Sequence, residues 1–150
     1  MKTIATQLDS IINEHISALR SLTDDELKYK PSPAKWSRKE ILGHIVDSAQ
    51  NNICRFIVAQ YEENPKIVYN PDKWVTFSNY QEYKLADLVN LCYLLNKHIV
   101  VILKNMAQEM GQRKCQTETL PTLEWLAHDY IKHLKHHLHQ VLELEPVAYP

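Results

Sequence analysis

The sequence contains little glycine and few cysteines. Only two of its 150 residues are glycine, which leaves little material for a glycine-rich phosphate-binding loop or for the glycine turns of β-hairpins. The three cysteines are odd in number and include no Cys-x-x-Cys pair. This usage argues against a disulfide framework and favours the reducing cytoplasm as the compartment.

The sequence also lacks a strong charge imbalance and an uninterrupted apolar run. The formal net charge is −1 and no Lys/Arg-rich tract occurs, so the composition gives no support for a nucleic-acid partner. The N-terminal residues MKTIATQLDS lack the apolar core of a signal peptide. The longest apolar stretch, residues 85–106, is interrupted by charged and polar residues, and we therefore predict no membrane span.

Apolar residues recur at three- and four-residue steps in four segments, which predicts four amphipathic helices. The first covers residues 4–19. The second begins after Ser37, because Ser37 and Glu40 form the pattern of a capping box. The third covers about residues 80–109, with first turns that can be separate, and the fourth about residues 122–143.

No segment combines period-two alternation with turn glycines, so no sheet is expected. The connection over residues 62–78 is long and carries three aromatic residues, and we expect it to pack over the body of the domain. Four helices in 150 residues predict an all-α protein with a single domain over residues 1–150, built as a four-helix bundle.

The fourth helix carries four histidines within the stretch HLKHHLHQ, residues 133–140. On a helical wheel of about 100° per residue, His133 and His137 fall together on the inner, apolar side. Their Cβ atoms are expected about 5–6 Å apart, so the two imidazoles can converge on one cation. His128 and His139 fall on the outer face and are expected in solvent.

A third ligand is required, and His44 is the best candidate. It lies on the second helix, at the border between the apolar face and a polar strip, and a bundle can bring that border against the fourth helix. His15, expected on the outer side of the first helix, and His98 are weaker candidates. The inward pair can also be structural, with imidazoles bonded to Tyr or carboxylate groups, because leaving them unpaired would cost several kcal/mol.

Two other metal classes are excluded by their own motifs. The helical zinc proteases need His-Glu-x-x-His, and here Leu134 follows His133. Di-iron bundles need Glu-x-x-His on two helices, and no Glu in this sequence has a His three residues later.

Two blocks of the sequence resemble the DinB-like superfamily of the DinB/YfiT type. One is KYKPSPAKWSRKEILGHIVDS, residues 28–48, in which Lys-Trp-Ser precedes a Glu, His44 and then Asp47. The other is TLEWLAHDYIKHLKHHLHQV, residues 122–141, in which a His-x3-His pair is followed three residues later by Gln140. The blocks occur in the order and at the separation that the family shows.

The resemblance implies a four-helix bundle that holds one divalent metal ion, zinc or nickel, through His44, His133 and His137. It also implies a homodimer and a small-molecule substrate. Members of the family are described as metal-dependent hydrolases and as thiol-dependent transferases, so a bacillithiol- or mycothiol-type S-transferase is the alternative to a hydrolase. A metal-binding or interaction bundle without enzymatic activity is the third reading.

Three histidine nitrogens leave coordination positions open for water or substrate, as in catalytic zinc sites. Such a metal generates hydroxide near neutral pH, or binds a thiol as thiolate. Three side chains are candidates to orient the imidazoles by accepting their remote N–H groups: Asp47, Asp129 and Gln140. No general base is identified, since the cap explains Glu40. Trp36 and Trp125 are packing residues or line a pocket mouth.

Overall fold

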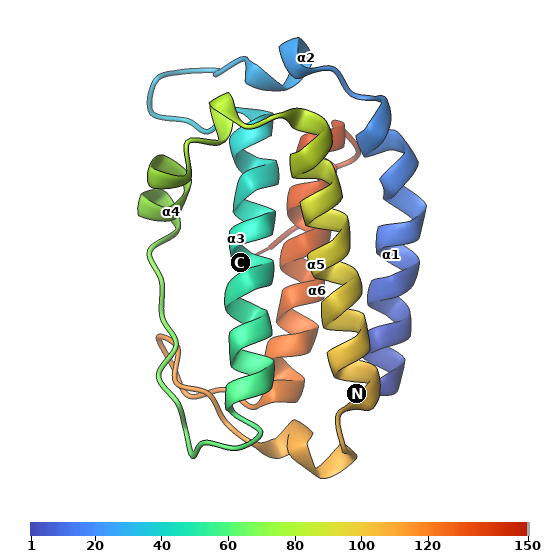
Figure 1. The fold of residues 1–150 in the computed structure, drawn as a ribbon, viewed down its shortest axis with the longest axis vertical. Coiled ribbons are helices and arrows are strands. Elements are labelled where there is room, and N and C mark those ends of the chain that lie inside the picture. Colours follow the sequence, from blue (N-terminus) through green and yellow to red (C-terminus); the bar gives the residue numbers. More distant parts are fainter. Residues whose placement is uncertain (150) are drawn as a thin grey trace.

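The computed structural model describes residues 1–149, which form a bundle of four long helices (Figure 1). The long helices are α1 (Lys2–Ser21), α3 (Arg38–Val58), α5 (Leu85–Asn105) and α6 (Leu123–Leu142). The shorter elements are α2 (Asp24–Lys28), α4 (Pro71–Ser78) and the 3₁₀ turns η1 (Tyr80–Glu82) and η2 (Gln108–Gln112). Within residues 1–149 the β-structure is limited to two isolated bridges. The prediction of an all-α four-helix bundle is confirmed.

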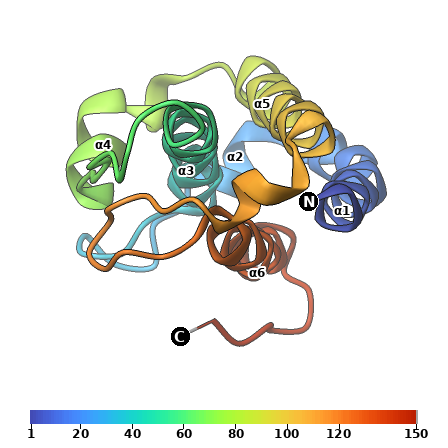
Figure 2. The same ribbon diagram turned by 90° about the horizontal axis from the view of Figure 1, so that it is seen from below.

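The helices are not arranged around the bundle in chain order. Helices α1 and α3 occupy opposite corners, and each contacts both α5 and α6 (Figure 2). Helices α3 and α5 run in the same direction, while α6 runs opposite to them (Figure 1). Parallel neighbours need a long return connection, and residues 59–84 supply it by running back along α3, against which α4 packs.

Side-chain caps set the starts of several helices. At α3, the Glu40 N–H donates to Ser37 Oγ, and the Ser37 N–H donates to the Glu40 carboxylate at 2.7 Å. Thr23 and Glu26 form the same reciprocal box at α2. Asn70 caps α4 by accepting the Lys73 N–H at 2.9 Å. The caps are local, so they fix where each helix begins independently of the packing.

Gly43 lies within α3, where glycine costs about 0.5–1 kcal/mol relative to alanine. A Cβ at this position would lie 2.1 Å from Cδ2 of Tyr80, so the Tyr80 ring packs directly on the helix backbone. The ring is buried, and its hydroxyl donates to Asp47 Oδ1 at 2.5 Å. Gly43 therefore lies where the Tyr80 ring contacts the helix backbone too closely to leave room for a side chain.

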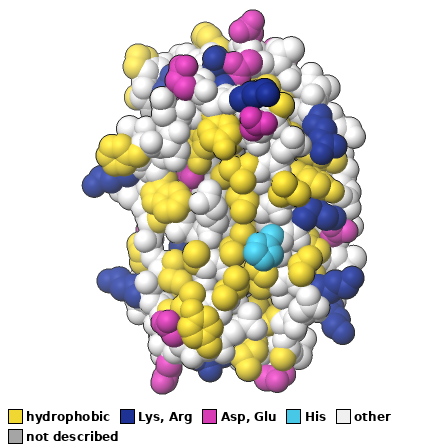
Figure 3. Space-filling model, viewed as in Figure 1, with side chains coloured by type: hydrophobic (Ala, Val, Ile, Leu, Met, Phe, Trp, Pro, Cys, Tyr) yellow, Lys and Arg dark blue, Asp and Glu magenta, His cyan; other side chains and the backbone are white. Residues whose placement is uncertain are grey.

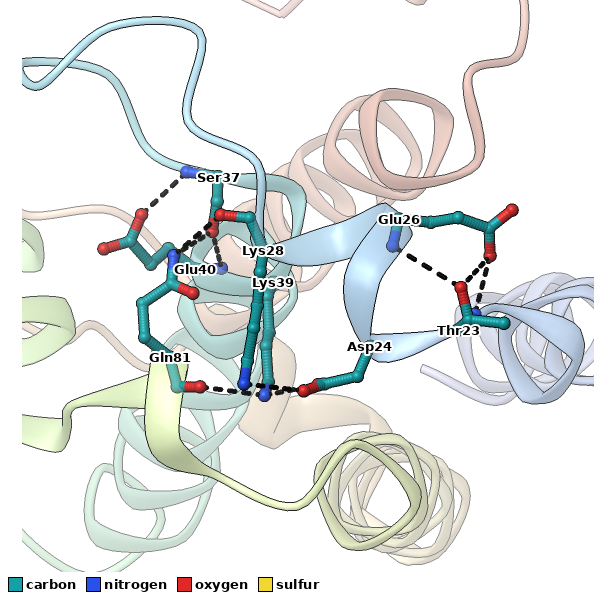
Figure 4. A network of polar contacts seen from close by, with 8 residues as sticks. All are labelled: Thr23, Asp24, Glu26, Lys28, Ser37, Lys39, Glu40 and Gln81. Carbon is teal, nitrogen blue, oxygen red and sulfur yellow. Dashed lines mark hydrogen bonds and ion pairs between the residues drawn. The ribbon is translucent and has the colours of Figure 1, made fainter.

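A buried lysine joins three elements at the end of the bundle where α3 begins (Figure 4). The Lys39 side chain is fully buried, and Nζ bonds to Asp24 Oδ1 at 2.6 Å and to the Gln81 carbonyl at 3.0 Å. Gln81 also donates from Nε2 to Ser37 Oγ at 2.7 Å. The contacts tie α2 and η1 to the start of α3.

Replacing Asp24 by alanine is expected to lower the free energy of unfolding by about 1–3 kcal/mol, because a buried ammonium loses its carboxylate partner. Because the Asp24 side chain is half-exposed, the expected loss of stability is smaller than for a fully buried ion pair. Urea unfolding measures the change. The neighbouring exposed Asp25→Ala is the control; equal effects of the two substitutions would contradict this role.

Helix α5 passes the length and composition criteria for a membrane-crossing helix, with a mean hydropathy of 1.4. In the structure it is a bundle helix that packs against α1 and α3. Leu88, Cys92 and Ile99 are buried on its inner side, as the predicted apolar stripe requires. Its other side exposes Leu94 and Val101.

Candidate metal centre

The antiparallel packing of α3 and α6 brings three imidazoles to one place. His44 lies in the first third of α3, and His133 and His137 lie one turn apart in the second half of α6. One nitrogen of each lies within 4.8 Å of the other two. The ring centroids of His44 are 4.9 Å from those of His133 and His137, which are themselves 4.4 Å apart.

The spacing of the nitrogens fits a metal ion. Zn–N bonds of about 2.0–2.1 Å at tetrahedral angles place ligand nitrogens about 3.3 Å apart. His44 Nε2 and His133 Nε2 are 2.9 Å apart, and all three nitrogens lie within 4.8 Å. Imidazole nitrogens suit zinc and nickel. The donor set and its spacing therefore match a three-histidine site.

A chain of hydrogen bonds fixes the tautomer of His137. The Val147 carbonyl can only accept, so His136 Nδ1, 2.6 Å away, carries the proton. His136 Nε2 then accepts from Gln140 Nε2 at 2.9 Å. Gln140 Oε1 in turn accepts from His137 Nδ1 at 2.8 Å. This leaves the Nε2 lone pair of His137 free for a ligand bond, as Nε2 ligation requires.

The other two imidazoles are less completely paired. His133 Nδ1 lies 3.5 Å from Ser48 Oγ. His44 Nδ1 is buried and has no hydrogen-bond partner within residues 1–149. Asp47 Oδ2, one turn along the same helix, is also buried and unpaired within that range. A buried unpaired ring nitrogen and a buried unpaired carboxylate oxygen this close in sequence mark a place where the hydrogen bonding is incomplete.

Burial keeps these histidines neutral. It lowers the pKa of His44 to about 4 and the pKa of His133 to about 2, and the charges of neighbouring histidines add to the shift. Burial also lowers the pKa of His137. Burial raises the pKa of Asp47 to about 6, against the hydrogen bond from Tyr80, which lowers it. Neutral imidazoles at physiological pH are the form that binds metal.

A cavity of about 220 Å³ adjoins the cluster and is lined by His44 and His133. Tyr149 forms part of its wall, with its ring centroid 5.3 Å from that of His133. Asp129, which the sequence suggested as an acceptor for an imidazole, instead accepts from the Tyr149 hydroxyl at 3.0 Å and lines the cavity. A larger hollow of about 790 Å³ lies at the other end of the bundle.

The remaining histidines fall outside the cluster, and two expectations for them are wrong. His15 is buried, with Nδ1 2.8 Å from the Ile11 carbonyl and its ring 5.9 Å from that of His139. It continues the apolar stripe of α1 one turn after Ile11, so it lies in the seam with α6. His139 is half-buried there rather than in solvent, whereas His128 and His98 are exposed.

The other sequence candidates take structural positions. Trp36 is partly buried with its ring centroid 5.0 Å from that of His44, so it packs against the cluster. Trp125 is 55% exposed and lines a neighbouring surface hollow. Glu40 is engaged by its cap and by Lys30 at 2.9 Å.

Sequence reasoning missed the roles of three residues near the cluster. Tyr80 and Tyr149 lie outside the two motif blocks. His136 lies within the second block, but its hydrogen bond to Gln140 leaves no periodic signal.

Two curated relatives share part of the sequence. A "Putative metal-dependent hydrolase" of Bacillus mycoides (strain KBAB4) is 30% identical over 69 residues, which are 45% of this chain and 40% of that protein. A protein of the same name from Bacillus cereus (strain AH820) is 29% identical over 93 residues, 61% of this chain and 52% of the relative. The chain therefore matches about half the length of these relatives or less.

Two solved structures share the fold. YfiT from Bacillus subtilis, described as "a probable metal-dependent hydrolase with an unusual four-helix bundle topology", aligns with a TM-score of 0.73 at 19% identity, over 95% of this chain and 87% of that one. A DinB-like protein of Bacillus subtilis, YjoA, aligns with a TM-score of 0.66 at 20% identity, over 98% and 96%. The sequence profile of the DinB superfamily matches residues 7–141. On that match, which covers most of the sequence, the chain belongs to the DinB superfamily.

Proposed function

We propose that this chain is a metal-dependent hydrolase of small molecules, with one zinc or nickel ion held by Nε2 of His44, His133 and His137. The convergence of the three imidazole nitrogens within 4.8 Å carries the proposal. The names of the relatives agree with it. Bound there, such an ion would supply a Lewis acid and would activate a water molecule at neutral pH.

The surrounding residues orient the ligands and shape the substrate site. Gln140 holds His137 through Nδ1, and Ser48 is placed to hold His133. We assign Asp47 Oδ2 as the acceptor for His44 Nδ1, because both atoms are buried and otherwise unpaired within residues 1–149. Tyr80 holds Asp47 through its other oxygen. The cavity beside His44 and His133 receives the substrate.

An activity screen on metal-loaded protein tests the reaction class. Ester, amide and lactam hydrolysis are measured beside the conjugation of low-molecular-weight thiols. Hydrolysis that depends on added metal is the expected result. Thiol conjugation alone would assign the chain to the S-transferases instead. Background rates in every assay, with one ion retained per chain, would show a metal-binding bundle without enzymatic activity.

Replacing Gln140 by leucine is expected to weaken metal binding about 10–100-fold, the usual cost of losing the partner of a ligand imidazole. Leucine removes the acceptor of His137 Nδ1 and the donor to His136. Competition with a chromogenic chelator measures the affinity. Lys132→Leu, at an exposed position of the same helix, is the control, and an unchanged affinity in Gln140→Leu would remove this residue from the site.

We also propose that the chain forms a homodimer through the outer faces of α3 and α5, where apolar side chains gather (Figure 3). Leu94 is 62% exposed and Val101 54% exposed on α5, and Ile57 is exposed on α3. Sedimentation at micromolar concentration is expected to show a dimer. Leu94→Glu combined with Val101→Glu is expected to give a folded monomer, whereas a monomeric wild type would end the proposal.

A further inference from the structure

The cavity beside the histidines shares part of its lining with a second hollow. The inner cavity of about 220 Å³ includes His44 and His133, and the outer hollow of about 360 Å³ includes Trp125 and residues 117–119. Residues that line both spaces form the junction between them: Arg55, Tyr69, Pro71, Leu126 and Asp129. The junction residues can therefore contact a ligand that occupies either space.

Arg55 presents a positive charge at the junction that is fixed in position. Its Nε and Nη2 each lie 3.2 Å from the Ile67 carbonyl, and Nη1 lies 3.4 Å from Asn52 Oδ1. Its Cζ lies 5.9 Å from the Tyr69 ring centroid. Within residues 1–149 no carboxylate lies at ion-pair distance from the guanidinium. The guanidinium is held by neutral groups, and the Asp129 carboxylate acts on it without forming an ion pair.

Asp129 presents the opposite charge at the same junction. Its Oδ2 accepts from the Tyr149 hydroxyl at 3.0 Å, while Oδ1 has no hydrogen-bond partner among the described residues. Asp129 and Arg55 line both hollows without forming an ion pair. A simple anion at Arg55 would be repelled by Asp129, and a simple cation at Asp129 would be repelled by Arg55. A ligand group that carries both charges satisfies both residues.

We propose that this junction binds the zwitterionic head of an amino-acid-like small molecule, with its carboxylate on Arg55 and its ammonium on Asp129. The inference rests on the metal site proposed above and names the substrate class of that site. Arg55 lies eleven residues after His44 on α3, about 16 Å along the helix. Side chains on a helix lean towards its N-terminus, so Arg55 leans towards His44. The head and the reactive group are therefore separated by several bonds.

Hydroxamates with different second ends test this assignment on the Co²⁺-loaded protein, in which the visible spectrum of the ion reports binding. Acetohydroxamate is the reference, since it lacks a charged end. The ω-hydroxamates of aspartate, glutamate and 2-aminoadipate carry the zwitterionic head at three lengths, and those of succinate, glutarate and adipate lack the amine. The best zwitterionic probe is expected to bind at least about tenfold more tightly than acetohydroxamate and than its amine-free counterpart.

Two variants locate the gain. Arg55→Gln and Asp129→Asn are each expected to abolish most of the extra affinity for the zwitterionic probe. The affinity for acetohydroxamate is expected to stay unchanged, which shows that the site is folded. Arg20→Gln, whose arginine lies over the Tyr93 ring on another part of the molecule, should keep the full gain. The proposal is overturned if no zwitterionic probe gains over acetohydroxamate, or if the gain survives both variants. A wild type that fails to retain Co²⁺ would instead refute the metal site, and this inference with it.

Discussion

Replacing His133 by alanine is expected to reduce the affinity for a divalent metal by well over the roughly 10–100-fold that loss of an outer partner costs. His133 supplies one of the three converging nitrogens, and its Nε2 lies 2.9 Å from that of His44. The two imidazoles that remain, His44 on α3 and His137 on α6, are expected to hold an ion much more weakly than three. Metal analysis of the purified variant, together with chelator competition, measures the loss.

The matched control for this substitution is His128→Ala, on the same helix but exposed and outside the cluster. It is expected to keep the full metal content and affinity. Both variants are expected to retain the helical circular dichroism of the wild type, because His133 contributes little to the apolar core. Unchanged metal content in His133→Ala would remove this residue from the coordination sphere.

The second large effect concerns the packing beneath the site. Gly43→Ala is expected to destabilise the protein by about 1–3 kcal/mol, because the new methyl group would overlap the Tyr80 ring. Helix propensity alone predicts the opposite sign, a gain of about 1 kcal/mol. Urea unfolding distinguishes the two. Displacing Tyr80 also breaks its hydrogen bond to Asp47, so metal affinity is expected to fall as well.

A double-mutant cycle isolates this clash. In the Tyr80→Ala background the ring is absent, and Gly43→Ala is expected to be neutral or stabilising. If Gly43→Ala has the same destabilising effect in both backgrounds, the close approach of Tyr80 is not its cause.

The long helices and the histidine cluster could be predicted because their signals are periodic. An apolar stripe fixes which face of a helix is buried, and that face decides which histidines point inward. His133 and His137 follow from this logic, and the antiparallel contact of α3 with α6 then brings His44 to them. The capping pattern of Ser37 and Glu40 predicted the start of α3 for a local reason.

The short helices were missed because they carry no such stripe. Helix α2 has five residues and α4 has eight, too few to establish a repeating apolar face. Local signals were present, however: Thr23 with Glu26 is a second capping box, and Asn70 followed by Pro71 is typical of a helix start. A search for caps independent of periodicity would have found both.

The residues that surround the histidine cluster depend on tertiary packing. Tyr80 reaches Asp47 across 33 positions of sequence, and Tyr149 reaches Asp129 across 20, so neither contact leaves a periodic pattern. His15 was misplaced for a simpler reason. Its polarity and its charged neighbour Glu14 favour an exposed position, but it lies one turn after Ile11 and therefore on the buried stripe of α1.

X-ray absorption spectroscopy of the zinc-loaded protein tests the central claim most directly. It is expected to show one ion per chain with three imidazole nitrogens at about 2.0–2.1 Å and one further light-atom ligand. His44→Ala and His137→Ala should each remove the imidazole signature. A protein that retains no stoichiometric zinc, or a spectrum with sulfur or fewer than three imidazoles around the ion, would contradict the three-histidine site.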